Sequence, residues 1–304
     1  MLKLTGSIEL PEHTQPGGFD HADIHPASNR LYVAHTCNNA IDVIDCTAGR
    51  YSHSIPGLTG VAGALISGGR VFTSNRGENT VGIFPVHNEN QMTRVPVGVR
   101  PNGLAFDPAR NLLLAANVGN PEILNSFTVS MVNVQRAELL HSIPVPGRTR
   151  WAIFDPQTDS FYVNIADPAV IVAVSAQNPG QISHSFPIPA AGPHGLDLDA
   201  ANRRLFCACD AGRLVTVGLP DGEIQSEGLL SGIPDVIFFH PNLQRLYVAV
   251  GDPGVIDVFD TKNMTHIESI ETGKGAHTFA LDKAHNTLYV FLPQNHSAAV
   301  YIDD

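Results

Sequence analysis

Short apolar runs alternate along the whole chain with clusters of Gly, Pro, Asn and Asp. The runs are rich in β-branched and aromatic residues, as in "RLYVAHT" (30–36) and "TLYVFLP" (287–293). Runs of this kind, bounded by turn-forming residues, are typical of short antiparallel strands. The pattern therefore predicts an all-β protein.

The runs recur in units of about forty residues, which is a repeat architecture. The first strand of each unit reads "DHADIHP", "AGALIS", "NGLAFDP", "RWAIFDP", "HGLDLDA", "DVIFFHP" and "HTFALDK" in turn. These strands end at positions 25, 67, 107, 155, 199, 240 and 282, so successive units lie 40 to 48 residues apart. A second and a third strand follow in each unit, and most units add a fourth. Four strands per unit predict a β-propeller, whose radial closure leaves few exposed sheet edges.

The two ends of the chain predict how the ring closes. The seventh unit stops after its third strand, at "AAVYIDD", and the N-terminal "LKLTGSIELPEHTQP" resembles the fourth strand of the third unit, "ELLHSIPVPGRTRW". We therefore expect one seven-bladed domain over residues 1–304, its last blade completed by the N-terminal strand. The expected blades span residues 18–56, 57–98, 99–146, 147–189, 190–229, 230–272, and 273–304 with 2–10.

The heads of the first strands are polar in six of the seven units. In a propeller these strands border the central channel, so their heads should form a ring around one mouth. The ring is Asp20, Ala62, Asn102, Arg150, His194, Asp235 and His277. Folding requires only small or turn-forming residues at this position, so the polarity favours a ligand site. Lining for ordered water is the alternative interpretation.

Part of the ring suits a divalent metal, because two imidazoles and two carboxylates come from neighbouring blades. The predicted metal ligands are His194, Asp235, His277 and Asp20. A one-residue slip in the first unit would put His21 in the place of Asp20.

The rest of the ring suits an organic ligand. Arg150 could grip a carboxylate or phosphate with two hydrogen bonds. The predicted ligand-binding residues are Arg150 and Asn102 from first strands, and His35, Asn75 and Asn117 from the ends of second strands.

Composition narrows the choice of partner and compartment. The chain is 43% hydrophobic and 15% charged, with a net charge of −11. Its 18 basic residues form no run along the sequence, which argues against nucleic acid and anionic membranes as partners. The N-terminus does not read as a signal peptide, and no apolar run is long enough for a membrane span. The four cysteines form neither a disulfide framework nor a CxxC pair. We expect a cytoplasmic monomer or weak oligomer.

The second strands "LYVAHT", "FYVNIA", "LYVAVG" and "LYVFLP" resemble the YVTN repeats of YncE-like β-propellers over the whole chain. This resemblance implies a seven-bladed propeller but little about function, because propellers support unrelated chemistries.

The strand heads "GPHGLD" and "GAHTFA" are similar to the Pro-His-Gly-like heads of virginiamycin B lyases, which are also seven-bladed propellers. That resemblance implies a metal that polarises a carbonyl, with His277 or His194 as base or ligand. Asp235 and Asp20 would complete the metal site or orient an imidazole. Here the two histidines lie in blades 5 and 7, with Asp235 between them.

We predict a propeller that binds a small, anionic molecule at a His/Asp/Arg site in the channel mouth, with one divalent metal ion as a candidate cofactor. One alternative is a metal-dependent lyase or lactonase acting on a small acidic or lactone substrate. Its catalytic candidates are His277, His194 and Arg150. The other alternative is a protein-interaction scaffold without catalysis. The usual hydrolase, kinase and dehydrogenase motifs are missing.

Overall fold

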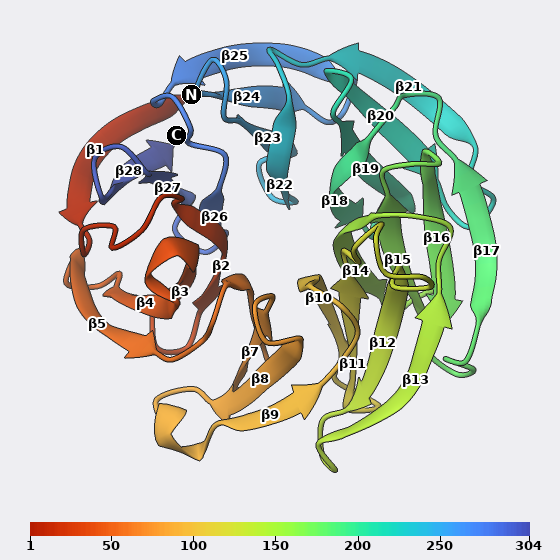
Figure 1. Cartoon of the computed structure of the whole chain (residues 1–304). Helices are drawn as coiled ribbons and strands as arrows, with labels where there is room; N and C mark the ends of the chain where they lie inside the picture. Colours follow the sequence, from red (N-terminus) through yellow and green to blue (C-terminus); the bar gives the residue numbers. More distant parts are fainter.

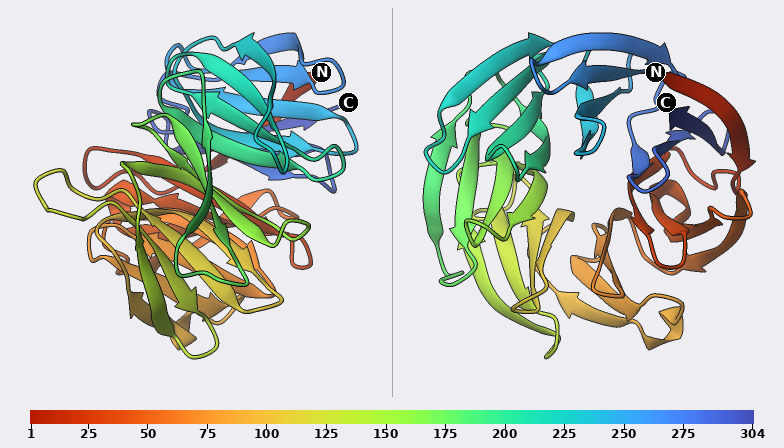
Figure 2. Two further views of the ribbon diagram at one scale, coloured as in Figure 1. Left: turned by 90° about the vertical axis from the view of Figure 1, so that its right-hand side faces the viewer. Right: turned by 180° about the vertical axis from the view of Figure 1, so that it is seen from behind.

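A computed structural model describes the whole chain, residues 1–304. Seven four-stranded antiparallel sheets stand in a ring around one axis, like the blades of a propeller (Figure 1). The view from behind shows the same ring (Figure 2). The predicted all-β, seven-bladed β-propeller is confirmed.

Each of the first six blades takes its strands in chain order, from the axis outward. Blade 1 contains β2 (Phe19–His25), β3 (Arg30–His35), β4 (Ala40–Asp45) and β5 (Arg50–Pro56). Blade 2 contains β6 (Val61–Ser67), β7 (Arg70–Asn75), β8 (Thr80–Pro85) and β9 (Thr93–Pro96). Blade 3 contains β10 (Pro101–Asp107), β11 (Leu112–Asn117), β12 (Thr128–Asn133) and β13 (Glu138–Pro144).

The remaining blades repeat this order until the ring closes. Blade 4 contains β14 (Thr149–Asp155), β15 (Ser160–Ile165), β16 (Val170–Ser175) and β17 (Ile182–Pro187). Blade 5 contains β18 (Pro193–Asp199), β19 (Arg204–Cys209), β20 (Arg213–Gly218) and β21 (Ile224–Leu229). Blade 6 contains β22 (Pro234–His240), β23 (Arg245–Val250), β24 (Val255–Asp260) and β25 (Thr265–Glu271). Blade 7 contains β26 (Phe279–Asp282), β27 (Thr287–Leu292), β28 (Ser297–Asp303) and β1 (Leu2–Glu9).

The ring closes through the N-terminal strand, as the sequence predicts. β1 pairs antiparallel with β28 from Leu2↔Asp303 to Glu9↔Ser297. The two ends of the chain consequently lie close together in Figure 1, red beside dark blue. The N-terminal ammonium group of Met1 lies 2.7 Å from Oδ1 of Asp303. The last blade is therefore built from both ends of the chain.

The apolar runs of the sequence become the buried inner strands. β11 is buried along its whole length, whereas β25 on the outer edge is largely exposed. Aromatic side chains join neighbouring blades, as where Phe72 and Phe106 lie with ring centroids 4.7 Å apart. Burial of these side chains between blades drives the packing of the ring. The structure also contains two short 3-10 helices, η1 (Thr36–Asn38) and η2 (Glu89–Gln91). It has no helix whose length and hydropathy suit a membrane crossing.

One irregularity recurs at the channel. In blades 1 to 6 the pairing between the first and second strands shifts just after the head of the first strand, as between Phe19 and Ala22 or Thr149 and Ala152. Such a bulge inserts an extra residue and re-aims side chains. It explains how two consecutive residues of a first strand can both serve the channel.

Candidate functional site

His194 lies at the centre of a hydrogen-bonded network at the channel mouth. Its Nδ1 is 2.7 Å from Oδ1 of Asp210, and its Nε2 is 3.1 Å from Oδ1 of Asp235. Nη1 of Arg150 lies 3.2 Å from the same Nε2, and Nη2 of Arg150 donates to Oδ2 of Asp210 at 3.1 Å. Two cationic side chains thus share two carboxylates. We call these four residues the mouth network.

The charges of the mouth network follow from its contacts. Burial alone would lower the pKa of His194, but the Asp235 and Asp210 carboxylates outweigh it and raise the pKa to about 9. Burial would likewise raise the pKa of Asp235, yet the positive charge of His194 holds that pKa well below its ordinary value. At neutral pH, His194 is therefore a cation and Asp235 an anion.

His277 stands beside this network and makes different contacts. Its Nδ1–H donates to the carbonyl oxygen of Gly275 at 2.8 Å, and its Nε2 lies 4.0 Å from Oδ2 of Asp235. The side chain is 36% exposed. In the neutral ring, the hydrogen bond from Nδ1 leaves Nε2 as the unprotonated nitrogen that can accept a proton.

A second group completes the mouth from blades 1 to 3. Nη2 of Arg76 donates to Oδ2 of Asp20 at 3.1 Å and to Oδ1 of Asn102 at 2.8 Å. His21, next to Asp20, is buried. This burial lowers the pKa of His21, although the negative charges of Asp20 and Asp235 act to raise it. Asp20 and Asn102, from the first strands of blades 1 and 3, thus meet at Arg76. Arg150, His194 and Asp235, from the first strands of blades 4 to 6, meet in the mouth network.

The sequence did not lead us to predict Arg76 and Asp210 as site residues. Both residues directly follow a second strand, β7 and β19, one position beyond the strand ends that the prediction considered. Their signal was present in the repeat: charged side chains at a position that four other blades fill with Val118, Ala166, Gly251 and Pro293.

Positive charge gathers on the same side of the mouth. Burial lowers the pKa of Arg148, and the neighbouring charges of Arg150, Arg100 and Arg76 lower it further. The charges of Arg76, Arg100 and Arg150 thus reach Arg148, in a chain whose net charge is −11. Nε of Arg76 and Nε of Arg150 are buried and have no hydrogen-bond partner. This concentration of guanidinium groups is the electrostatic signature of a site for an anion.

The predicted residues from the second strands do not reach this site. His35, Asn75 and Asn117 are fully buried and bond within their own blades. Nδ1 of His35 lies 2.6 Å from Asp42, and Nδ2 of Asn117 donates to Thr128 at 2.9 Å. Side chains alternate along a strand, and at this position they face the third strand rather than the channel.

Asn164, one residue before the end of β15, has a positioning role instead. Its Nδ2 donates to the backbone carbonyls of His194 at 2.9 Å and Gly195 at 3.1 Å. Oγ of Ser74 holds the carbonyl of Asn102 at 2.7 Å from the equivalent place in blade 2. The second strands thus fix the heads of the next blade.

The four predicted metal ligands are only partly brought together. Asp235 lies between His194 and His277, while Asp20 is paired with Arg76. The ligand atoms of no three of these residues all lie within 4.8 Å of one another. Both ring nitrogens of His194 are already engaged, and a guanidinium group lies against one of them. This arrangement favours an anionic ligand over a cation.

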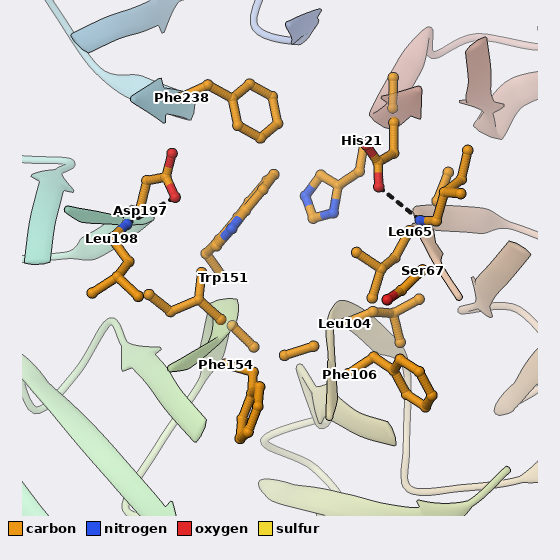
Figure 3. Close-up of a pocket in the computed structure, with 18 residues that line it drawn as sticks. His21, Leu65, Ser67, Leu104, Phe106, Trp151, Phe154, Asp197, Leu198 and Phe238 are labelled. Carbon is orange, nitrogen blue, oxygen red and sulfur yellow. Dashed lines mark hydrogen bonds between the residues drawn. The ribbon is translucent and has the colours of Figure 1, made fainter. Parts of the chain in front are cut away.

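An apolar chamber borders the mouth residues inside the channel. It is a cavity of about 380 Å³ with 13 hydrophobic residues among the 18 that line it. In Figure 3, His21 and Trp151 point toward each other, and their ring centroids are 4.2 Å apart. Trp151 lies directly after Arg150, at the bulge, and lines the chamber. It also packs against apolar side chains of the neighbouring blades.

Two acidic residues in the chamber wall hold neighbouring blades together. Oδ2 of Asp23 accepts from the backbone N–H of Ile66 at 2.7 Å, and Oδ2 of Asp197 accepts from that of Phe239 at 2.6 Å. Burial raises the pKa of Asp23 to about 6, and burial also raises the pKa of Asp197. Each carboxyl group satisfies a backbone donor of the next blade, which is a structural role.

The buried thiols of Cys207 and Cys209 lie 3.8 Å apart within β19. They point the same way, as two residues in alternate positions of a strand must. Asn164 and the neighbouring apolar residues of the blade surround them. Their place is in the core, away from the mouth.

Comparison with known proteins adds information on the fold. No family model matches the chain, and no curated protein matches it in sequence. A solved structure described as "Kuenenia stuttgartiensis Hydrazine Synthase" covers 95% of this chain and 96% of its own, with 12% sequence identity and a TM-score of 0.82. At that identity the likeness shows a shared fold alone.

Proposed function

We propose that the protein binds a small carboxylate or phosphate at the channel mouth, between the mouth network and Arg76. The observation that carries the proposal is that Arg76 and Arg150 each have a buried Nε–H without a hydrogen-bond partner, in a protein with a net charge of −11. Arg76 and Arg150 are held in place by carboxylates, which orients their guanidinium groups before a ligand arrives. Protonated His194 adds a further positive charge beside them.

The test is isothermal titration at pH 7 with citrate, succinate and inorganic phosphate as separate probes. We expect at least one of them to bind, and Arg150→Gln to weaken that binding by roughly 10- to 100-fold, since a hydrogen bond to a charged group contributes about 1.5–3 kcal/mol. Arg136→Gln is the matched control, because it removes the same charge from a side chain that is 63% exposed and belongs to the turn leading into outer strand β13. Binding to Arg150→Gln as tight as to the wild type would contradict the proposal.

A second candidate function is proton transfer on the bound anion, as in a lyase or lactonase. It is supported by the contacts of His277, whose Nδ1–H donates to the carbonyl of Gly275 while Nε2 lies 4.0 Å from Oδ2 of Asp235. A base must reach the proton that it removes with an unprotonated nitrogen. The neutral ring of His277 would present Nε2 for this, whereas both nitrogens of His194 are engaged by carboxylates.

The two candidates separate in one variant. If the protein is an enzyme of this kind, His277→Gln abolishes turnover of small lactone or hydroxy-acid substrates and leaves probe-anion affinity within about twofold, because Gln keeps a polar side chain of similar reach. Turnover that survives in His277→Gln excludes His277 as the base. A wild type that binds anions and turns over none of these substrates favours the binding function.

A further inference from the structure

A group of three potential metal ligands lies outside the channel, where the segment after β1 crosses blade 1. His13 belongs to that segment, His35 ends β3, and Cys37 lies in η1. Each residue brings one ligand atom within 4.8 Å of those of the other two. We call these three residues the seam cluster.

The histidines of the seam cluster have unmet hydrogen-bonding capacity. His35 is 0% exposed, and its Nδ1 is engaged by Oδ2 of Asp42 at 2.6 Å. Its Nε2 is buried and has no partner, and the same holds for Nε2 of His13. A buried polar atom without a partner requires an explanation. A histidine that donates one nitrogen to a carboxylate and leaves the other free is the usual arrangement of a metal ligand and its supporting residue.

Aromatic packing accounts for the position of these rings but not for their nitrogens. The ring of His13 meets those of His35, Phe19 and His296 edge to face, at centroid distances of 5.0, 5.3 and 4.3 Å. Such contacts are favourable for any aromatic ring. Phenylalanine would serve equally well, without leaving two buried nitrogen atoms unsatisfied.

The backbone around the cluster is already fixed. Oδ1 of Asn38 accepts from the backbone N–H of Thr14 at 2.8 Å, and Nδ2 of Asn38 donates to the carbonyl of Glu12 at 2.9 Å. Oγ1 of Thr14 donates to the carbonyl of Cys37 at 3.0 Å. These bonds tie the residues on both sides of His13 to η1, so the three ligands are held together without an ion.

We propose that the seam cluster binds one Zn²⁺ ion through His13, His35 and Cys37. Zinc takes imidazole and thiolate ligands in a tetrahedral shell, and three protein ligands leave one position for water or a fourth side chain. Cys37 is a free, buried thiol and would lose its proton to the solvent when the ion binds. The ion would join the segment after β1 to blade 1, next to the strand that closes the ring. This proposal does not depend on the proposed function of the channel mouth.

The test is metal content after incubation of tag-free protein with zinc chloride and gel filtration in metal-free buffer. We expect about one zinc per chain in the wild type, as for a three-ligand site, and a loss of nearly all of it in Cys37→Ser and in His35→Gln. Cys46→Ser and His25→Gln are matched controls that remove the same groups elsewhere, and they should keep the metal. Circular dichroism verifies that each variant is folded.

Cobalt supplies a second readout that does not require a variant. Co²⁺ bound by the seam cluster should give a thiolate-to-metal absorption band in the near ultraviolet, together with the visible bands of a tetrahedral site. A wild type that retains no zinc, or cobalt-loaded protein without the thiolate band, overturns the proposal. Retention of zinc by folded Cys37→Ser at the wild-type level overturns it as well.

Discussion

The molecule has two histidine sites that differ in one physical respect. At the channel mouth, both nitrogens of His194 are engaged by Asp210 and Asp235. In the seam cluster, Nε2 of His35 and Nε2 of His13 are buried with no partner. The comparison shows that gathering histidines and carboxylates does not by itself make a metal site, because such groups can satisfy one another.

The difference follows from the surroundings of each site. At the mouth, Arg76, Arg150 and His194 form ion pairs with three carboxylates. The Nε–H groups of Arg76 and Arg150 are buried there without a partner and can donate to an anion. Next to the seam cluster lies one carboxylate, that of Asp42, which is fully buried and already bound to Nδ1 of His35. The mouth is therefore suited to an anion and the seam cluster to a cation.

Replacing the supporting carboxylate sharpens this contrast most strongly. Asp42→Asn should lower the affinity of the seam cluster for zinc by roughly 10- to 100-fold, as is usual when the partner of a metal-bound histidine is removed. Titration of zinc against a competing chelator measures the effect. Asp42 also accepts a hydrogen bond from Ser54 at 2.6 Å. Ser54→Ala is therefore the control, because it removes that hydrogen bond and leaves the contact between Asp42 and His35 in place. Anion affinity at the mouth should not change. Zinc affinity in Asp42→Asn equal to that of the wild type would contradict the supporting role of Asp42.

The pH dependence of the two sites should run in opposite directions, with a smaller effect. Asp235 and Asp210 raise the pKa of His194 from 6.5 to about 9, so its positive charge is lost only as the pH rises through 9. Anion affinity should then fall by up to about tenfold between pH 7 and pH 10, the loss expected for one charge-assisted contact. Zinc affinity should instead fall as the pH drops, since protons compete for the ligands.

The same pKa shift bears on stability. A folded-state pKa above the unfolded value means that the ion pairs of His194 contribute fully below about pH 6.5 and fade as the pH rises through about 9. Histidine proton chemical shifts followed by NMR would measure this titration directly, with His194→Gln used to assign the signal. A midpoint for His194 near or below its ordinary value would contradict the described network.

The repeat explains how much of this could be predicted. The blades, the closure by β1 and the residues at the strand heads follow from a period in the sequence and the symmetry of a propeller, which places equivalent positions on one face. His194, Asp235, Arg150 and Asp20 were located in this way. The exact direction of a side chain does not follow from the period. The side chain of His35 therefore lies within its blade, bonded to Asp42, and not in the channel as predicted.

Two kinds of site residue could not be predicted from the repeat. Arg76 and Asp210 stand one position beyond a strand end, where loops can carry any side chain and most blades carry apolar or small ones. His13 belongs to the segment that joins the closing strand to blade 1, so it has no equivalent in the other units. Its contact with His35 and Cys37 depends on tertiary structure alone.

The most direct test of the contrast between the two sites is an X-ray anomalous difference map at the zinc absorption edge, from crystals soaked in zinc chloride. We expect a peak among His13, His35 and Cys37, and none among His194, Asp235 and His277. A peak at the channel mouth would show that its residues bind a cation after all. A map without a peak at the seam cluster would contradict the assignment of that site.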